Sequence, residues 1–156
     1  MIEVKELRKS FNNEVEVLKG ITTTFETGKV NLIIGQSGSG KTVFLKSLLN
    51  VYEPSSGSIL FDGRDIMTMS QEEKQVLRSE IGTVFQGSAL FDSMTVEENI
   101  SFPLDMFTNL TYREKKRKVL EVIGRVNLEK ANKKFPSEIS GGMQKRVAIA
   151  RAIVNN

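Results

Sequence analysis

One octapeptide early in the chain reads Gly35-Gln36-Ser37-Gly38-Ser39-Gly40-Lys41-Thr42. It matches G-x-x-x-x-G-K-[ST], a pattern whose glycines let the backbone curl so that successive N–H groups face phosphate oxygens. Lys41 would then supply a charge to the β- and γ-phosphates, and the Thr42 hydroxyl is a ligand suited to Mg²⁺. The alternative interpretation is a glycine-rich turn with an ordinary lysine. We predict a nucleotide phosphate site at residues 35–42.

The sequence on either side of this loop supports that prediction. The apolar run Val30–Ile34 indicates a buried strand before the loop, and Thr42–Leu49 has the apolar spacing of a helix that begins at the loop. A helix N-terminus favours a bound anion. No guanine-reading Asn-Lys-x-Asp sequence is present, which favours ATP.

The rest of the chain alternates strand and helix patterns, which indicates an α/β fold. Predicted strands are Ile2–Leu7, Val15–Phe25 with a break at Gly20, Ser58–Phe61 and Ile81–Phe85. Predicted helices are Ser70–Ser79, Thr111–Val126 and Met143–Val154, the first two with capping-box patterns at Ser70/Glu73 and Thr111/Glu114. From about Thr95 onward the chain is rich in helix patterns, which suggests a helical subdomain.

Composition narrows the class of protein. The chain has 156 residues, of which 39% are hydrophobic and 26% charged, values typical of a soluble globular domain. It has no run of about 18 apolar residues that would span a bilayer. Residues 1–5 lack the features of a secretory signal, and the absence of cysteine excludes disulfides and fits the cytosol.

The net charge of +3 does not point to a nucleic-acid partner. The densest basic run is Arg113–Lys118, which has no interleaved aromatic residues and is typical of the solvated face of a helix. We therefore expect no nucleic acid among the partners.

A second motif, Ile139-Ser140-Gly141-Gly142-Met143-Gln144, opens the last predicted helix. By itself it is explained equally well as a Ser-Gly-Gly helix cap. Together with the phosphate loop it resembles the Leu-Ser-Gly-Gly-Gln signature of ABC-type ATPases, and the resemblance covers the whole chain in order. It implies a P-loop NTPase fold with an ABC ATPase core, a β subdomain and a helical subdomain.

The resemblance assigns roles to named residues. ATP would be contacted by the whole loop from Gly35 to Thr42 and by Val43, with Mg²⁺ bound through Thr42 and Gln86. Lys41 and Gln86 would be the catalytic residues, and Gln86 would also link the ATP site to a membrane partner. Phe11 would stack on adenine, although a core phenylalanine is an equal alternative.

The signature residues Ser140, Gly141 and Gly142 would clamp the γ-phosphate of ATP held by a second subunit. A serine hydroxyl and backbone N–H groups at a helix N-terminus suit that task. The resemblance therefore implies a homodimer formed through ATP.

A longer segment narrows the resemblance to one branch of the family. Residues 85–100, followed by Phe102-Pro103-Leu104, together with residues 142–146, are similar to the branch that serves bacterial phospholipid transport, the Mla or mammalian-cell-entry type. Ile139 and Met143 depart from the commonest signature, which has Leu and Gln there. This branch implies an ATP-binding subunit that couples ATP hydrolysis to transport, bound to a permease at the cytoplasmic face of the cell membrane.

The family also has an Asp-Glu pair and a histidine on strands that follow the signature helix, and this chain has neither that pair nor any histidine. We therefore expect residues 1–156 to be one incomplete ABC domain, with a core and β subdomain at 1–94 and a helical subdomain at 95–156. The C-terminal part of the core would be missing. Val30–Ile34 and Ile81–Phe85 would then expose apolar faces and unpaired edges, and the chain would bind ATP without hydrolysing it.

Several alternatives remain open from the sequence alone. One is an ABC ATPase of a non-transport complex, such as a division complex or a translation factor; others are a P-loop kinase or GTPase and an inactive binding module. A further prediction concerns apolar residues after Gln86. Some of them would form a groove that receives a helix of the permease, and the equal alternative is that they pack inside the helical subdomain. These residues are Leu90, Phe91, Met94, Phe102, Leu104 and Met106.

Overall fold

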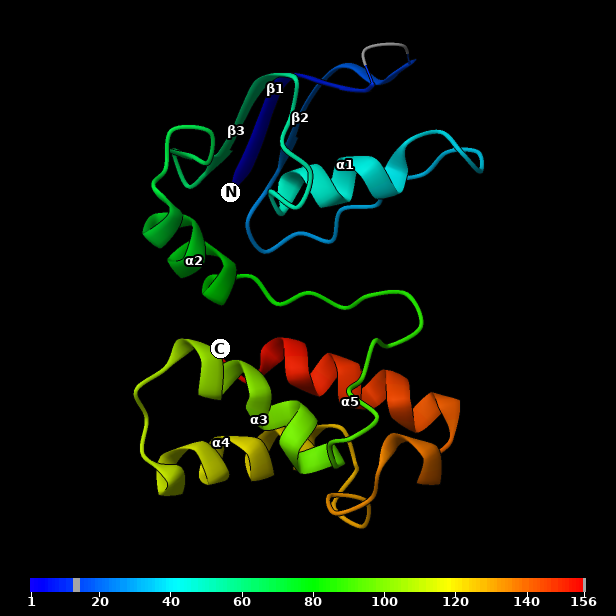
Figure 1. The fold of residues 1–156 in the computed structure, drawn as a ribbon, viewed down its shortest axis with the longest axis vertical. Helices are drawn as coiled ribbons and strands as arrows, with labels where there is room; N and C mark the ends of the chain where they lie inside the picture. The colour runs from blue at the N-terminus through cyan, green and yellow to red at the C-terminus, as the bar shows by residue number, and fades with distance from the viewer. Residues whose placement is uncertain (13–14, 156) are drawn as a thin grey trace. The chain divides into compact units, whose positions relative to one another are not determined.

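The computed structural model describes residues 1–12 and 15–155, and these form two compact units, Met1–Lys74 and Gln75–Asn156. The first combines a sheet with one helix, and the second is helical (Figure 1). The boundary falls inside helix α2, Gln71–Glu80. The sequence predicted a different boundary, after residue 94, between the core with its β subdomain and the helical subdomain. That boundary stays a prediction.

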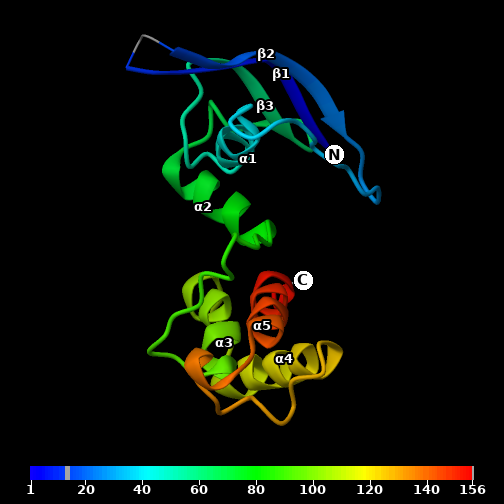
Figure 2. The same ribbon diagram turned by 90° about the vertical axis from the view of Figure 1, so that its right-hand side faces the viewer.

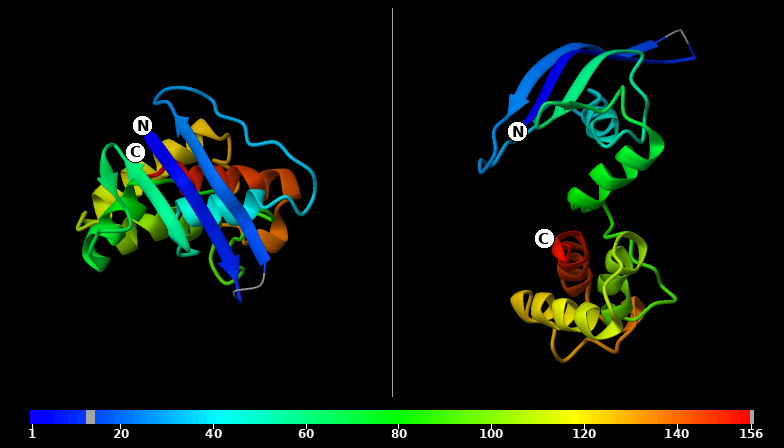
Figure 3. Two further views of the ribbon diagram at one scale, coloured as in Figure 1. Left: turned by 90° about the horizontal axis from the view of Figure 1, so that it is seen from above. Right: turned by 90° about the vertical axis from the view of Figure 1, so that its left-hand side faces the viewer.

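Four strands of the first unit form one antiparallel sheet in the order β2-β1-β3-β4 (Figure 3). Their bounds are β1 Ile2–Phe11, β2 Val15–Phe25, β3 Ser56–Phe61 and β4 Arg64–Asp65. The central strand β1 pairs Ile2 with Phe25 on one side and with Phe61 on the other. The predicted break at Gly20 is confirmed, because the β1–β2 register shifts there and Gly20 has a φ of +82°.

Helix α1, Lys41–Leu48, lies against one face of this sheet and contacts β2 (Figure 2). Its Phe44 ring is buried, and the ring centroid lies 6.2 Å from that of Phe25. The apolar face differs from the sequence pattern in one respect: Leu45 is exposed, whereas the Ser47 side chain is buried. This contact holds the start of α1, and with it the phosphate loop, beside the sheet.

Two predicted strands are not formed. Residues 30–34 and 81–85 have no regular secondary structure, and neither segment pairs with a strand of the described sheet. Most of their apolar side chains are exposed, with fractions of 101% for Val30, 83% for Leu32 and 80% for Ile34, whereas Ile33 and Ile81 are partly buried. A strand needs a neighbouring backbone for its hydrogen bonds, and none is provided here. The strand predictions are therefore wrong, and the predicted exposure of their apolar faces is confirmed.

The second unit packs three helices against one another, α3 Val96–Phe107, α4 Tyr112–Arg125 and α5 Gly141–Ile153, with a 3₁₀ turn at Pro136–Glu138 (Figures 1 and 2). The predicted helices α4 and α5 are confirmed, and α3 is an addition that carries Pro103 in its interior. The helices bury a shared apolar core. Its members are Val96, Ile100, Leu104, Val119, Val122, Ile123, Leu128, Ala131, Ile139, Val147, Ala150 and Val154.

Capping boxes set the starts of α2, α3 and α4. The predicted box at Ser70 is present, since Ser70 N–H donates to Glu73 Oε2 at 2.7 Å and Glu73 N–H donates to Ser70 Oγ at 3.2 Å. The Thr111 box of α4 is confirmed as well, and α3 has an equivalent box at Thr95. None of the helices in the described part of the chain has the length and apolar character that crossing a bilayer requires.

Candidate nucleotide-binding site

The phosphate loop, residues 35–40, is largely exposed and leads directly into α1. Gly38 and Gly40 have left-handed backbones, with φ of +79° and +90°. At Gly40 space also requires glycine, because a Cβ there would lie 3.2 Å from both the Val17 carbonyl oxygen and its Cγ1. The loop can run this close to β2 because Gly40 has no side chain.

The N-terminus of α1 is capped by Gly40, which offers no side-chain acceptor to the first turn. The first helical bond is donated by Phe44 N–H to the Gly40 carbonyl at 2.8 Å. The preceding N–H groups, those of Lys41, Thr42 and Val43, belong to the first turn, where a helix has no internal acceptors. No acidic residue lies in that turn. An anion is the natural partner for such a terminus.

Lys41 folds back over the loop. Its Nζ donates hydrogen bonds to the carbonyl oxygens of Gly35 and Gln36, each at 2.7 Å, while Ser39 N–H donates to the Gln36 carbonyl at 3.2 Å. The ammonium group is therefore held at the loop, beside the N–H groups of the first helical turn. A bound phosphate would meet a positive charge and backbone donors together.

These features fit Mg-ATP as the ligand. The loop provides a glycine cradle, unpaired N–H donors and one fixed ammonium group, and the Thr42 side chain is exposed next to them. The described residues contain no group of three or more acidic side chains that could hold a metal ion by themselves. Mg²⁺ takes few protein ligands and otherwise binds substrate phosphates and water, and Thr42 would be its ligand here. Bound Mg²⁺ would supply positive charge to the phosphate oxygens.

Phe11 lies at the end of β1 and is 37% exposed, so the alternative of a core phenylalanine is wrong. Its ring meets the edge of Tyr52 at a centroid distance of 5.4 Å and an interplanar angle of 84°. Lys9 Nζ lies 5.1 Å from the Phe11 ring centroid. An exposed, fixed aromatic ring can stack on a base, and the adenine contact of Phe11 stays a prediction.

The remaining predicted site residues lie in the second unit. Gln86 is exposed beside Gly87 in a turn. Ser140 caps α5, with its Oγ accepting a hydrogen bond from Met143 N–H at 3.3 Å, and Gly141 and Gly142 are exposed after it. The N-terminus of α5 is thus open to an anion, as the signature role requires.

The two departures from the commonest signature have a packing explanation. Ile139 is a member of the apolar core of the second unit, and Met143 packs against that core. Gln144, the next residue, donates from Nε2 to the Pro136 carbonyl at 2.9 Å, so its amide is used inside the unit.

Two polar residues that organise the segment after Gln86 were not predicted from the sequence. Asn99 is fully buried in α3, where its side chain accepts from Phe91 N–H at 2.8 Å and donates to the Phe91 carbonyl at 3.1 Å. Arg151 of α5 donates to the Ser88 carbonyl at 3.0 Å. The only sequence signal for Asn99 is an amide on the apolar face of a helix.

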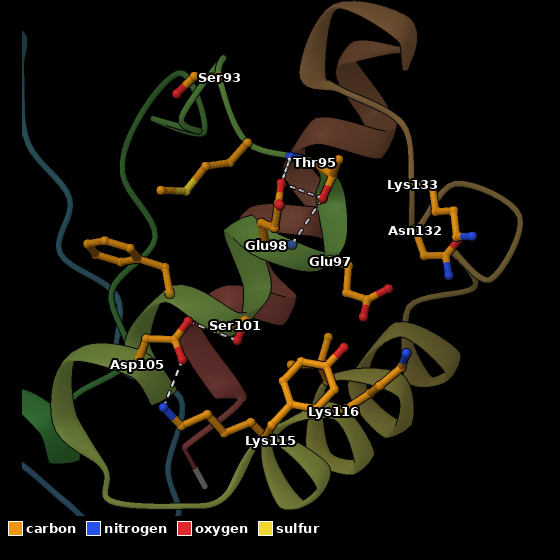
Figure 4. Close-up of a pocket in the computed structure, with 14 residues that line it drawn as sticks. Ser93, Thr95, Glu97, Glu98, Ser101, Asp105, Lys115, Lys116, Asn132 and Lys133 are labelled. Atoms are coloured by element: carbon orange, nitrogen blue, oxygen red, sulfur yellow. Dashed lines mark hydrogen bonds and ion pairs between the residues drawn. The ribbon is translucent and has the colours of Figure 1, made fainter.

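A groove of about 650 Å³ lies between α3, α4 and the loop at 132–133 (Figure 4). Its wall on one side carries an ion pair in which Lys115 Nζ lies 2.8 Å from Asp105 Oδ1. Figure 4 shows Glu97 on α3 across from Lys116 on α4, with Lys133 beyond them. Met94 and Phe102 add apolar surface to this groove.

Comparison with known proteins places the chain in a family. The family described as "ABC transporter" matches residues 18–156. The chain is 41% identical over all of its 156 residues to the cell division ATP-binding protein FtsE of Bacillus subtilis, of which it covers 68%. It is 44% identical over 153 residues, 98% of the chain, to the probable ribonucleotide transport ATP-binding protein mkl of Mycobacterium tuberculosis, and spans 42% of that relative.

A solved structure agrees with these relatives. The ATP-binding cassette MJ0796, in a dimeric post-hydrolysis state bound to ADP and Pi, is similar with a TM-score of 0.89 and 31% identity over 100% of this chain and 70% of that one. The expected α/β P-loop NTPase fold is thereby confirmed. From the phosphate loop, the signature cap and these comparisons together, the chain belongs to the ABC transporter family of ATP-binding proteins.

Proposed function

We propose that this chain binds Mg-ATP and serves as the ATP-binding subunit of a membrane complex that it drives by ATP hydrolysis. The observation that carries the proposal is the glycine-capped start of α1, where the Lys41 ammonium lies 2.7 Å from two loop carbonyls. Relatives along the whole chain are ATP-binding proteins of transport and of division. Residues 35–43 hold the phosphates, and Thr42 and Gln86 hold Mg²⁺.

The catalytic contribution of these residues is charge neutralisation and positioning, which dominate phosphoryl transfer. Lys41 offsets charge on the β- and γ-phosphates, and Gln86 orients the attacking water. Ser140, Gly141 and Gly142 present the N-terminus of α5 to ATP on a second copy of the chain. The active form in this proposal is a homodimer closed through ATP, as a dimeric state of the cassette MJ0796 supports.

Substitution of Lys41 tests the proposed site. In the full-length protein, Lys41→Ala removes a charged donor, an interaction of about 1.5–3 kcal/mol, so we expect ATP affinity or turnover to fall roughly 10- to 100-fold. Calorimetric titration and a phosphate-release assay measure the two quantities. Lys29→Ala, an exposed lysine in the turn before the loop, is the control and should leave both unchanged. Wild-type binding and hydrolysis in Lys41→Ala would remove the basis of the proposal.

For the transported molecule we propose a phospholipid, moved across or between bacterial membranes. The support is the resemblance of residues 85–104 to the phospholipid-transport branch. The test reconstitutes the protein with its membrane subunits and follows ATP-dependent movement of a labelled phospholipid between vesicles. Movement that depends on ATP and is lost in Lys41→Ala supports transport, whereas turnover without lipid movement contradicts it.

The second candidate is the ATPase of a division complex, which the 41% identity to FtsE favours. The two candidates differ in cellular consequence. Depletion of a division ATPase blocks septation and leaves long cells, whereas loss of a phospholipid transporter alters membrane lipid composition. Microscopy and lipid analysis of one depletion strain separate them.

We further propose that a permease helix docks on the apolar residues after Gln86, which places the protein at the cytoplasmic face of the membrane. Of the six predicted residues, Leu104 is fully buried and Leu90 packs against the same core, so these two are excluded as docking residues. Met106 is 55% exposed, Phe91 is exposed, and Phe102 lines the groove between α3 and α4.

A charge placed on this surface tests the docking proposal. Met106→Glu and Phe102→Glu should reduce capture of the membrane subunit roughly tenfold, because each buries a carboxylate against an apolar helix face. Leu120→Glu, at an exposed leucine of α4 outside this groove, is the matched control. Undiminished capture by both variants would place the docking surface elsewhere.

A further inference from the structure

The second half of α5 and the turn that follows it contact residues 79–88, the stretch that contains Gln86, at three points. Asn155 Nδ2 donates to the Ser79 carbonyl at 3.3 Å, and Arg151 Nη2 donates to the Ser88 carbonyl at 3.0 Å. Between them, Gly82 lies so close to α5 that an added Cβ would stand 2.1 Å from the Ala152 carbonyl oxygen. Along the chain, the exposed residue Gln86 lies between Gly82 and Ser88.

The backbone next to Gln86 is strained. Gly87, Ser88 and Ala89 are three consecutive left-handed residues, with φ of +76°, +65° and +45°. For residues with a Cβ this conformation is unfavourable, so it persists only where surrounding contacts hold it. Within the turn, Ser88 N–H donates to the Phe85 carbonyl at 3.2 Å. The Ser88 carbonyl in turn accepts a hydrogen bond from Arg151 of α5.

Arg151 contacts this turn through its guanidinium group. Its guanidinium carbon lies 5.8 Å from the Phe91 ring centroid while its Nη2 donates to the Ser88 carbonyl, so one side chain contacts the turn and the residue that follows it. Phe91 is itself fixed by Asn99, which bonds both its N–H and its carbonyl. Burial lowers the pKa of Arg151 from its ordinary value. The lower dielectric of a partly buried site strengthens a hydrogen bond made there.

We propose that Arg151 is a positioning residue that fastens the turn at residues 86–89 to α5, the helix that Ser140 caps. Gln86 and Ser140 are then connected through α5. A displacement of the Gln86 turn would therefore move the N-terminus of α5, where Ser140 lies. The inference rests on the proposed role of Gln86 in ATP turnover.

Hydrogen exchange tests the fastening directly. In the full-length protein, Arg151→Ala should raise amide exchange in residues 85–91 about tenfold or more, because a hydrogen bond to a charged group is lost. The matched control is Arg146→Ala: Arg146 also lies on α5 and also bonds carbonyls, those of Val126 and Asn127 at 2.8 and 3.0 Å. Arg146→Ala should leave exchange in residues 85–91 at the wild-type rate, and Arg151→Lys should give an intermediate rate. Equal exchange in Arg151→Ala and wild type overturns the proposal.

Kinetics then test whether Arg151 acts through Gln86. In the complex with the membrane subunit, Arg151→Ala should lower kcat roughly 10- to 100-fold with little change in KM, since misplacement of a positioned group affects the reacting state. On a Gln86→Ala background the same change should have no further effect on kcat. Multiplicative losses would overturn the proposed coupling. If Gln86→Ala leaves turnover at the wild-type level, the role of Gln86 fails, and the exchange experiment still decides whether Arg151 holds the turn.

Discussion

At the scale of single residues, the two left-handed glycines of the phosphate loop differ in what surrounds them. A Cβ at Gly38 would meet nothing within 4 Å, whereas at Gly40 it would meet the Val17 carbonyl at 3.2 Å and Leu18 Cδ2 at 3.3 Å. Both positions carry the cost of a positive φ for other residues, and only Gly40 adds a collision with β2. A comparison of substitutions at Gly38 and Gly40 therefore distinguishes the cost of backbone strain from the cost of a steric clash.

We predict that Gly38→Ala lowers the free energy of unfolding by about 1–2 kcal/mol through strain alone. Gly40→Ala should cost more, about 2–4 kcal/mol, because overpacking typically adds 1–3 kcal/mol. Urea unfolding of the full-length protein and both variants measures the difference. Equal losses would mean that the Val17 contact relaxes without cost.

At the scale of elements, the helices of the second unit depend on reciprocal caps. Glu98 Oε2 accepts from Thr95 N–H at 2.7 Å and from Thr95 Oγ at 2.8 Å, and Glu114 repeats this arrangement with Thr111. Hydrogen bonds from the threonine backbone and hydroxyl lower the pKa of Glu98, and those of Thr111 lower the pKa of Glu114, below the ordinary 4.5. Each carboxylate thus links the first turn of its helix to the threonine that caps the helix.

A lowered folded-state pKa fixes the direction of the pH effect. The stabilisation is fully present above the ordinary glutamate pKa of 4.5 and is lost as the pH falls through the lowered value. We predict that Tm falls between about pH 5 and pH 3, and falls less in a Glu98→Gln, Glu114→Gln double variant, because glutamine keeps the capping geometry without titrating. Thermal melts at several pH values provide the measurement. Glu97→Gln, one residue from Glu98 and outside the capping box, should retain the wild-type slope.

At the scale of the whole molecule, the apolar segments 30–34 and 81–85 are exposed and unpaired. Unpaired apolar backbone of this kind invites strand pairing with another chain. The phosphate loop follows the first of these segments and Gln86 follows the second. The residues predicted to contact ATP are thus attached to segments that have no strand partner in the described part of the chain.

We predict that the 156-residue chain by itself binds ATP but shows no steady-state turnover. The Asp-Glu pair and the histidine that the ABC resemblance leads us to expect are not among residues 1–156. Loss of a general base costs about 10²–10⁴-fold in rate. A phosphate-release assay on this chain, run beside a version as long as its relatives, provides the comparison. Similar Mg-dependent turnover in both would show that residues within 1–156 supply the base.

The sequence by itself determined the features that depend on local chemistry. The Ser70, Thr111 and Ser140 caps and the Gly20 break are short-range features, and each occurs where the spacing of residue types predicted it. The ABC resemblance carried by residues 35–42 and 139–144 is confirmed by the family comparison. A helix cap or a glycine turn satisfies its own hydrogen bonds within a few residues, which makes it readable from a short stretch.

Only the tertiary structure decided the features that need distant partners. Val30–Ile34 has the composition of a strand and is not one, because a strand is made by the backbone beside it. Phe11 proved to be exposed, α3 formed in spite of Pro103, and Asn99 and Arg151 came to hold the Gln86 turn from two different helices. Burial, strand pairing and contacts to remote carbonyls depend on which segments meet in space, and residue spacing along one segment does not specify that.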